Sequence, residues 1–227
     1  MLSPLFWLTA GLAAVDWAAV ARKGTPGLMS RLHWITKPAV LLALIAWYSQ
    51  QGGWQNGGAW FGAGLVFSLL GDVLLLLPER FFLAGAGAFL LAHLAYIAGL
   101  CLGIPLPPWQ ILIAALPAAA AFATLRGRLR AGLQAKGKID LYLPVSIYAL
   151  ALSAMWAAAL STLLRPDWQA NPALVVAIGG TLFFLSDTLL AYDRFIQPIR
   201  SGPLLVMVTY HSGQMLLAAG ALLHWLF

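Results

Sequence analysis

Charged residues are scarce in this sequence. Asp, Glu, Lys and Arg make up 9% of its 227 residues, whereas a soluble globular domain usually carries about 25%. Hydrophobic residues reach 62% and the mean hydropathy is +0.86, so the apolar runs leave no room for a sizeable soluble domain. The composition therefore predicts a polytopic membrane protein with one membrane domain over residues 1–227.

Cysteine is nearly absent, and the motifs of several enzyme classes are missing. The single cysteine, Cys101, excludes an intramolecular disulfide. The four histidines form no H-x-x-x-H or Cys/His set, and there is no Gly-rich phosphate loop, Ser-centred elbow or dinucleotide-binding fingerprint. We therefore expect no metal and no cofactor. A metal site formed by Asp72, His93 and Asp187 is nevertheless geometrically conceivable. The N-terminus lacks a charged region ahead of its apolar run, which argues against a cleaved signal peptide.

Eight apolar stretches are each long enough to cross a bilayer, which takes about 20 residues. They cover approximately residues 4–21, 31–49, 59–77, 81–103, 109–125, 141–163, 172–191 and 203–225. Gly, Pro and charge clusters separate them, such as RGRLRAGLQAKGK at 126–138. We therefore predict an all-α fold, a polytopic bundle of eight transmembrane helices.

Basic residues gather on one side of this bundle. The loops between helices 1 and 2, 3 and 4, 5 and 6, and 7 and 8 hold 11 of the 13 Lys and Arg residues, and the other side has Arg165 alone. The positive-inside rule places these loops in the cytoplasm and both termini outside. We expect an integral protein of the bacterial inner membrane, with loop 126–138 as an orientation signal that touches membrane lipids and no nucleic-acid partner.

Ionisable side chains within the spans are functional candidates, because burying them in hydrocarbon is costly. They are Asp16, Lys37, Asp72, His93 and Asp187, accompanied by Tyr96, Tyr148, Tyr210, His211 and Gln214. Counted from the span ends at about 1.5 Å per residue, the polar groups of independent helices fall in one slab of the cytoplasmic half, with no comparable cluster in the outer half. This common depth predicts a site open toward the cytoplasm or its leaflet.

A weak internal repeat supports the same site. FSLLGDVLLL around Asp72 resembles FFLSDTLLA around Asp187, and each aspartate is followed by a helix with an aromatic and polar patch. The two aspartate helices run in the same direction, which suggests a parallel duplication of helices 1–4 and 5–8. The duplication would bring both aspartates to related positions facing one cavity.

Each candidate also has a structural interpretation. Asp72 and Asp187 can pair with Lys37 or a surface arginine, and Asp16 can neutralise Lys37. Lys37 can also extend to the inner surface. His33 lies near a span end and carries no signal. Packing or helix-contact roles apply equally to His93, Tyr148 and His211.

Several motifs together resemble the YhhN family of lysoplasmalogenase-like membrane proteins. They are KPAVLL at 37–42, FSLLGDVLLLLP at 67–78, FLLAHLAY at 89–96, SDTLLAYDRF at 186–195 and TYHSGQMLLAAG at 209–220. The resemblance implies a hydrolase that cleaves the vinyl ether bond of lysoplasmalogens into a fatty aldehyde and glycerophosphocholine or glycerophosphoethanolamine. It points to Asp72 and Asp187 as the catalytic pair. The substrate-binding candidates are then Lys37, His93, Tyr96, Tyr148, Tyr210 and Gln214.

Two buried aspartates suit this chemistry. Acid opens a vinyl ether by protonating carbon, and water captures the resulting oxocarbenium ion, much as in glycoside hydrolysis by paired carboxyl groups. Low dielectric allows one of Asp72 and Asp187 to stay protonated while the other is ionised. The expected substrate is a lysophospholipid from the cytoplasmic leaflet, with Lys37 placed for its phosphate.

Three other classes compete with the hydrolase. A proton-coupled transporter also uses paired intramembrane acids, although the polar slab is one-sided. An intramembrane aspartyl protease needs two aspartates, but the Gly-x-Gly-Asp pattern fails because Leu69 stands at the first glycine. A structural or lipid-binding membrane protein is the third class, and it predicts inert aspartates.

Overall fold

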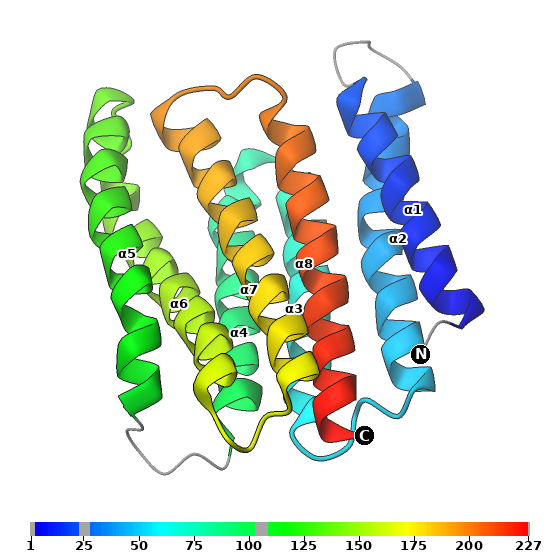
Figure 1. Ribbon diagram of the computed structural model, residues 1–227. Coiled ribbons are helices and arrows are strands. Elements are labelled where there is room, and N and C mark those ends of the chain that lie inside the picture. Colours follow the sequence, from blue (N-terminus) through cyan, green and yellow to red (C-terminus); the bar gives the residue numbers. More distant parts are fainter. Residues whose placement is uncertain (1–2, 23–27, 103–108, 227) are drawn as a thin grey trace.

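The computed structural model describes residues 3–22, 28–102 and 109–226, and over these ranges it is an all-helical bundle without strands (Figure 1). The α-helices are α1 Pro4–Ala21, α2 Leu28–Gln50, α3 Gly58–Leu76, α4 Phe82–Cys101, α5 Trp109–Ala135, α6 Tyr142–Ser161, α7 Ala170–Ala191 and α8 Gly202–Trp225. Short 3₁₀ turns precede α4 and α6 and follow α6, and a π-helical turn, Tyr192–Ile196, follows α7. The predicted polytopic helical bundle is confirmed.

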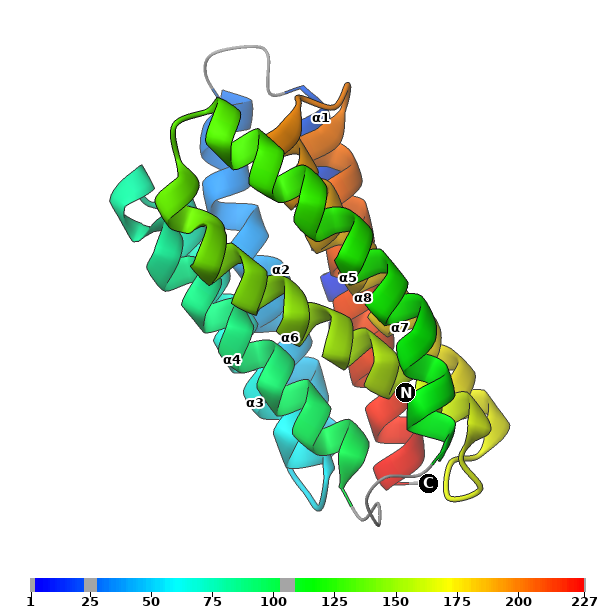
Figure 2. The same ribbon diagram turned by 90° about the vertical axis from the view of Figure 1, so that its left-hand side faces the viewer.

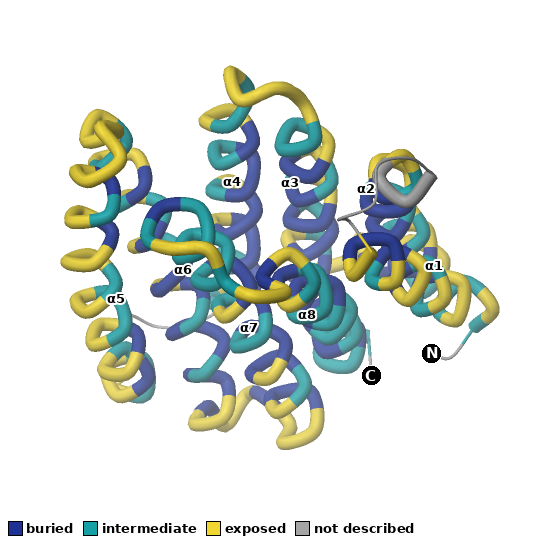
Figure 3. Tube along the Cα trace, turned by 90° about the horizontal axis from the view of Figure 1, so that it is seen from above, coloured by how far each residue is buried: buried dark blue, intermediate teal, exposed yellow. Residues whose placement is uncertain are grey.

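The helices form four sequential hairpins, in which α1 packs on α2, α3 on α4, α5 on α6 and α7 on α8. Helix α5 lies at one edge of the bundle and α1 at the other, with α7 and α8 between them (Figures 1 and 2). Figure 3 shows the buried side of most helices turned toward the interior and a largely exposed α5. The chain ends lie at one end of the bundle, opposite the turns that follow α3, α5 and α7 (Figure 1). We call the end with these turns the basic end, because most Lys and Arg residues lie toward it.

Helix boundaries differ from the predicted ones mainly at α5. This helix continues to Ala135, ten residues past the predicted end at 125, and so includes Arg126, Arg128 and Arg130. Arginine and alanine are strong helix formers, so the helix extends beyond its apolar stretch instead of ending where hydropathy falls. The basic segment is therefore partly helix, not a loop throughout.

Seven of the eight helices are long and apolar enough to span a membrane by composition, and α2 is the exception among the described residues. Three of its polar side chains, His33, Thr36 and Lys37, are buried against other helices. Its outward residues include Trp34 and Ile35, both at least half exposed. Helix α2 is 23 residues long, enough to cross hydrocarbon, and its lower hydropathy reflects a polar face turned inward.

The packing pattern repeats between the two halves. Helix α2 contacts α3 and α8, and α6 contacts the corresponding helices α7 and α4. This correspondence agrees with the suggested parallel duplication of helices 1–4 and 5–8.

Helices α7 and α8 approach closely through glycine. A Cβ atom at Gly179 would lie 2.7 Å from the backbone nitrogen of Leu217, and one at Gly213 would lie 2.9 Å from that of Phe183. Such distances leave no space for a larger residue, as at other small-residue contacts between membrane helices. The close approach fixes how the polar residues of α7 and α8 face their neighbours.

Candidate active site

Asp72 on α3 is completely buried and held from two other helices. Lys37 Nζ on α2 lies 3.1 Å from Asp72 Oδ1, and the Tyr210 hydroxyl on α8 donates a 2.8 Å hydrogen bond to Oδ2. The contact with Lys37 is an ion pair, and a nearby positive charge favours the ionised form of a carboxyl group. The surroundings of Asp72 therefore suit a carboxylate.

Asp187 on α7 has a different set of partners. The Tyr148 hydroxyl on α6 donates to Asp187 Oδ2, and His93 Nε2 on α4 lies 3.3 Å from the same oxygen and 3.1 Å from the Tyr148 hydroxyl. Within the described ranges, no hydrogen bond involves Asp187 Oδ1, and the residue is 7% exposed. One oxygen is thus held by α4 and α6, and the other is left for a ligand.

The two aspartate sites are related by the repeat. Each aspartate contacts the second helix of its own half, through Lys37 for Asp72 and through Tyr148 for Asp187. Each also contacts the last helix of the other half, through Tyr210 and His93 respectively. The aromatic and polar patch after each aspartate therefore serves the opposite aspartate, which joins the halves at one site.

Both aspartates line one cavity of about 420 Å³ near the basic end, within the range of about 300–1,000 Å³ for small-molecule sites. Lys37, Tyr148 and Tyr210 also line it. Most of the remaining lining is aliphatic or aromatic and comes from α4, α6, α7 and α8: Phe82, Leu83, Phe89, Leu90, Leu143, Val145, Ile147, Leu190 and Val206 among others. We call this space the apolar cavity.

The apolar cavity reaches the side of the bundle between α4 and α6. Leu83 on α4 is 48% exposed, and Leu143 and Ile147 on α6 are 67% and 49% exposed, although all three line the cavity. In a membrane this side of the bundle faces lipid. The lining of the apolar cavity therefore continues into apolar side chains exposed on the lipid-facing side of α4 and α6.

A second cavity of about 240 Å³ adjoins the first. We call it the charged cavity, because five ionisable residues line it: His33, Lys37, Glu79, Asp193 and Arg194. It shares several lining residues with the apolar cavity, among them Lys37, Phe82 and Arg194. The aspartates line only the apolar cavity, and Lys37, which contacts Asp72, connects them to the charged cavity.

Three predicted pocket residues, His93, Tyr96 and Gln214, line neither cavity. Tyr96 donates a 2.6 Å hydrogen bond to Gln214 Oε1, and both side chains are fully buried. Phe183 packs against both Tyr96 and Tyr210, with ring centroids 6.2 and 5.6 Å apart. Tyr96 and Gln214 therefore lie behind Tyr210 and support it instead of facing the cavity.

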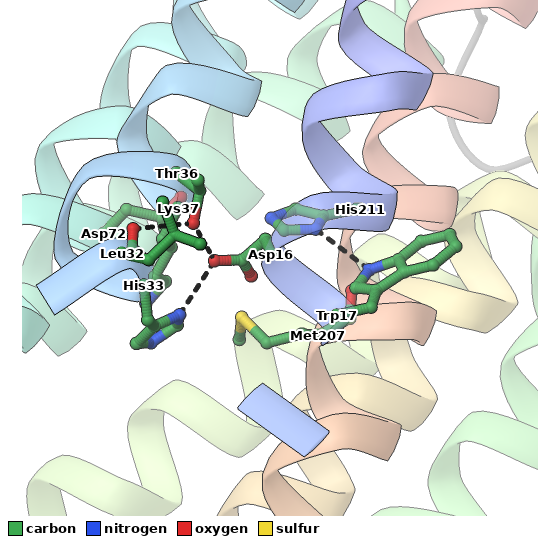
Figure 4. Close-up of polar contacts among 9 residues, drawn as sticks. All are labelled: Asp16, Trp17, Leu32, His33, Thr36, Lys37, Asp72, Met207 and His211. Carbon is green, nitrogen blue, oxygen red and sulfur yellow. Dashed lines mark hydrogen bonds and ion pairs between the residues drawn. The ribbon is translucent and has the colours of Figure 1, made fainter. Parts of the chain in front are cut away.

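Asp16 forms a separate cluster between α1 and α2 (Figure 4). Its Oδ1 lies 2.8 Å from His33 Nδ1 and accepts a 2.6 Å hydrogen bond from the Thr36 hydroxyl. Lys37, on the same helix, pairs with Asp72 instead (Figure 4). The sequence interpretation in which Asp16 neutralises Lys37 is wrong, and His33, which carried no signal in the sequence, is Asp16's partner.

Neighbouring α1 and α8 residues make further polar contacts in the same region. Trp17 Nε1 lies 3.1 Å from His211 Nδ1 and 3.2 Å from the Met207 carbonyl oxygen. Figure 4 shows this contact on the opposite side of Asp16 from His33. Helix α1 is therefore tied to α2 and to α8 by buried polar groups.

The sequence interpretation also missed Arg194 and Glu79. Arg194 Nη2 lies 2.6 Å from Glu79 Oε2, and its guanidinium stacks 4.1 Å from the centre of the Phe82 ring. Arg194 follows Asp187 by seven residues, the spacing of one helical face. That spacing was a usable signal, as was the i, i+4 spacing of His33 and Lys37.

The opposite end of the bundle holds a buried polar residue, Arg165, which lies between α6 and α7 and outside the predicted spans. Arg165 is 6% exposed, donates to the Leu100 carbonyl oxygen and is 3.0 Å from Asp167 Oδ1. Hydrogen bonding to Arg165 lowers the pKa of the Asp167 carboxyl below its usual value. The cluster joins the end of α4 to the turn before α7 and lines neither cavity.

No group of three or more His, Cys, Asp or Glu side chains in the described ranges is arranged to hold a metal ion. His93 and Asp187 are in contact, but Asp72 is bound to Lys37 and Tyr210 instead of completing a triad with them. Asp72, His93 and Asp187 therefore do not form the metal site that the sequence left conceivable.

Comparison with known proteins gives a family match over most of the chain. The profile of the YhhN family matches residues 32–221, which leaves α1 and Asp16 outside the matched range. No solved structure matches the chain.

Three relatives show the extent of the similarity. A pig (Sus scrofa) protein named lysoplasmalogenase TMEM86B is 36% identical over 154 residues, 68% of this chain and 59% of that protein. A Mycobacterium bovis protein named lysoplasmalogenase is 30% identical over 240 residues, 94% of this chain and 82% of that protein. The uncharacterized membrane protein YhhN of Escherichia coli is 27% identical and covers 82% of this chain and 85% of its own length. The chain therefore spans less than two thirds of the pig protein but most of the two bacterial ones.

Proposed function

Because the chain belongs to the YhhN family, we propose that it is a membrane hydrolase that cleaves the vinyl ether bond of lysoplasmalogens. The products are a fatty aldehyde and a glycerophospho-alcohol. Two of its similar relatives carry the name lysoplasmalogenase, and the family match includes both cavity aspartates and the side chains that hold them.

One observation carries the proposal: both aspartates line the apolar cavity, and Lys37, the ion-pair partner of Asp72, lines both that cavity and the adjoining charged cavity. A lysoplasmalogen has one hydrocarbon chain and one charged glycerophospho headgroup, and its vinyl ether bond joins the two. A chain in the apolar cavity and a headgroup in the charged cavity would bring that bond beside Asp72 and Asp187. The shape of the site therefore fits the substrate at the atoms that react.

We assign the acid role to Asp187. Asp187 lines the apolar cavity, and Tyr148 and His93 hold its Oδ2, while its Oδ1 has no hydrogen bond within the described ranges. A protonated Asp187 transfers its proton to the vinyl carbon farther from the oxygen, and the double-bond electrons form the new C–H bond. The carbon that bears the ether oxygen is then an oxocarbenium ion.

We assign the charge-stabilising and water-activating role to Asp72. Lys37 and Tyr210 hold it as a carboxylate beside the same cavity. Water adds to the oxocarbenium carbon and gives a proton to Asp72, which forms a hemiacetal. When the hemiacetal C–O bond breaks, Asp72 returns that proton to the glycerol oxygen and Asp187 recovers its own from the hemiacetal hydroxyl.

The remaining candidates position these groups. Tyr148 and Tyr210 line the cavity, and their hydroxyl oxygens can accept hydrogen bonds from substrate while their protons are donated to the aspartates. His93 orients the Tyr148–Asp187 pair. Tyr96 and Gln214 support Tyr210 from behind. We propose that the substrate comes from the cytoplasmic leaflet, through the side opening between α4 and α6, in the bacterial inner membrane.

The test is the reaction itself. Purified protein incubated with lysoplasmalogen should release fatty aldehyde, and in deuterated water the aldehyde carbon next to the carbonyl should carry one deuterium. A substrate analogue with a saturated ether should bind without reacting, because it has no double bond to protonate. Folded protein that releases no aldehyde would refute the proposal and favour transport by the same buried acids.

A further inference from the structure

We infer that Arg194 binds the substrate phosphate, and that Glu79 occupies its guanidinium until the phosphate replaces the Glu79 carboxylate. The ligand chemistry is a phosphate diester anion attached to a single hydrocarbon chain. The inference rests on the proposed function and assigns a residue that the sequence pattern alone did not single out.

Arg194 has the right place for this role. It lines both cavities, and it lies seven residues after Asp187, about 10 Å along the helix axis toward the basic end. In a lysoplasmalogen the three-carbon glycerol unit separates the ether bond from the phosphate, so both groups must be bound close together.

Lys37, the residue expected from the sequence to contact the phosphate, is less suited to it. Its side chain is 8% exposed and its Nζ lies 3.1 Å from Asp72 Oδ1. A phosphate at Lys37 would compete with Asp72 and place a second anion beside a buried carboxylate. Arg194 is 32% exposed, so its guanidinium meets a headgroup at the cavity mouth.

The guanidinium is also pre-positioned. It stacks on the Phe82 ring at 4.1 Å, and the backbone carbonyl of Arg194 accepts a 2.8 Å hydrogen bond from Lys136 Nζ. A planar guanidinium held in this way can donate two parallel hydrogen bonds to phosphate oxygens. The stacking and the backbone contact do not involve Glu79, so they keep the Arg194 guanidinium in place when phosphate replaces the Glu79 carboxylate.

Glu79 is well placed to be displaced. Its side chain is 65% exposed, and an exposed ion pair of this kind contributes little stability. Its other oxygen, Oε1, lies 3.3 Å from Lys138 Nζ. Glu79 can therefore release Arg194 and stay paired with Lys138.

Two charge-neutralising variants test the inference, because they should change the affinity for phospholipid in opposite directions. The ligands are a saturated-ether lysophospholipid and the phosphate-free alkylglycerol with the same chain, titrated into detergent-solubilised protein. Arg194→Gln should weaken phospholipid binding about 10-fold or more, with alkylglycerol binding unchanged. Glu79→Gln should strengthen phospholipid binding about 2- to 5-fold, because the internal competitor is lost.

Matched controls separate the phosphate contact from a structural one. Arg80→Gln removes a basic residue that lines neither cavity, so it should change neither affinity. Arg194→Lys keeps the charge without the two-point geometry and should fall between wild type and Arg194→Gln. Thermal unfolding of each variant reports whether it is folded.

Several outcomes would overturn the inference. If Arg194→Gln and Glu79→Gln each lowered the affinity for both ligands equally, the ion pair would only stabilise the structure of the cavity mouth. Unchanged phospholipid binding in folded Arg194→Gln would exclude Arg194, even if inorganic phosphate alone competed with the lipid. Binding is measured without turnover, so a protein that binds the phospholipid through Arg194 but releases no aldehyde would refute the hydrolase and keep the phosphate site.

Discussion

At the residue scale, the site depends on how each carboxylate is held rather than on the presence of two carboxylates. Asp72 faces an ammonium and a tyrosine hydroxyl, whereas Asp187 faces a tyrosine and a histidine on one oxygen only. Groups of the same type placed in different surroundings take different protonation roles. The two partner sets therefore predict unequal roles for Asp72 and Asp187.

Substitution of the two aspartates tests those roles. Asp72→Asn and Asp187→Asn keep the side-chain shape but remove the proton donor or the charge, so each should reduce aldehyde release by at least about 10²–10⁴-fold. In deuterated water, the residual aldehyde made by Asp72→Asn should still carry deuterium next to the carbonyl, because protonation of carbon is assigned to Asp187. Normal turnover in either folded variant, measured as aldehyde per unit protein, would remove that residue from the mechanism.

Sequence reasoning could find the ionisable residues of the site but not all their partners. The intramembrane location of Asp72 and Asp187 is visible in the hydropathy pattern, since each interrupts an apolar run. That Lys37 meets Asp72 while Asp16 meets His33 depends on how α1, α2 and α3 cross. Helix crossing is a tertiary property, and spacing along one chain does not fix it.

At the element scale, hydropathy located the helices well because membrane spans have a minimum length. It misplaced the end of α5, where a basic helical segment continues past the apolar run. It found α2 at 31–49, although the polar face of this helix lowers its mean hydropathy. Helix α1 is a different case, because the family match begins after it, at residue 32. Its polar contacts are to α2 and α8 and not to the cavity aspartates.

The position of Asp16 predicts a role in helix packing and not in chemistry. Asp16→Ala leaves His33 and Thr36 without their buried partner, which costs about 1–3 kcal/mol for such groups. We therefore expect a lower thermal unfolding midpoint in detergent. Aldehyde release per folded molecule should stay within about twofold of wild type, because the loss of about 1–3 kcal/mol affects folding and not the reaction.

A matched control is Thr9→Val on the same helix, whose hydroxyl bonds only to the Leu5 carbonyl oxygen within α1. This variant should change the unfolding midpoint less than Asp16→Ala. Loss of turnover in a stably folded Asp16→Ala protein would place Asp16 in the reaction and contradict the packing role.

At the scale of the whole molecule, the two cavities make sense only with a defined orientation in the bilayer. Both lie near the basic end, where the turns after α3, α5 and α7 meet. Under the proposed function, the charged cavity takes the headgroup from the water side and the apolar cavity takes the hydrocarbon chain from lipid. The side of the membrane that the basic end faces would then set which leaflet supplies the substrate.

Topology is the last prediction. The basic bias of 11 residues against Arg165 alone places the basic end in the cytoplasm. Alkaline phosphatase, active only outside, should be active when fused after Gln50 or at the C-terminus and inactive when fused after Lys138. A fluorescent-protein reporter that works only inside should give the reverse pattern.

The fusion after Gln50 decides whether α2 crosses the membrane, because a helix that failed to cross would leave that reporter in the cytoplasm. An inside reading at the C-terminus would mean an odd number of spans or an inverted bundle, and an inverted bundle would move the charged cavity away from the cytoplasmic face.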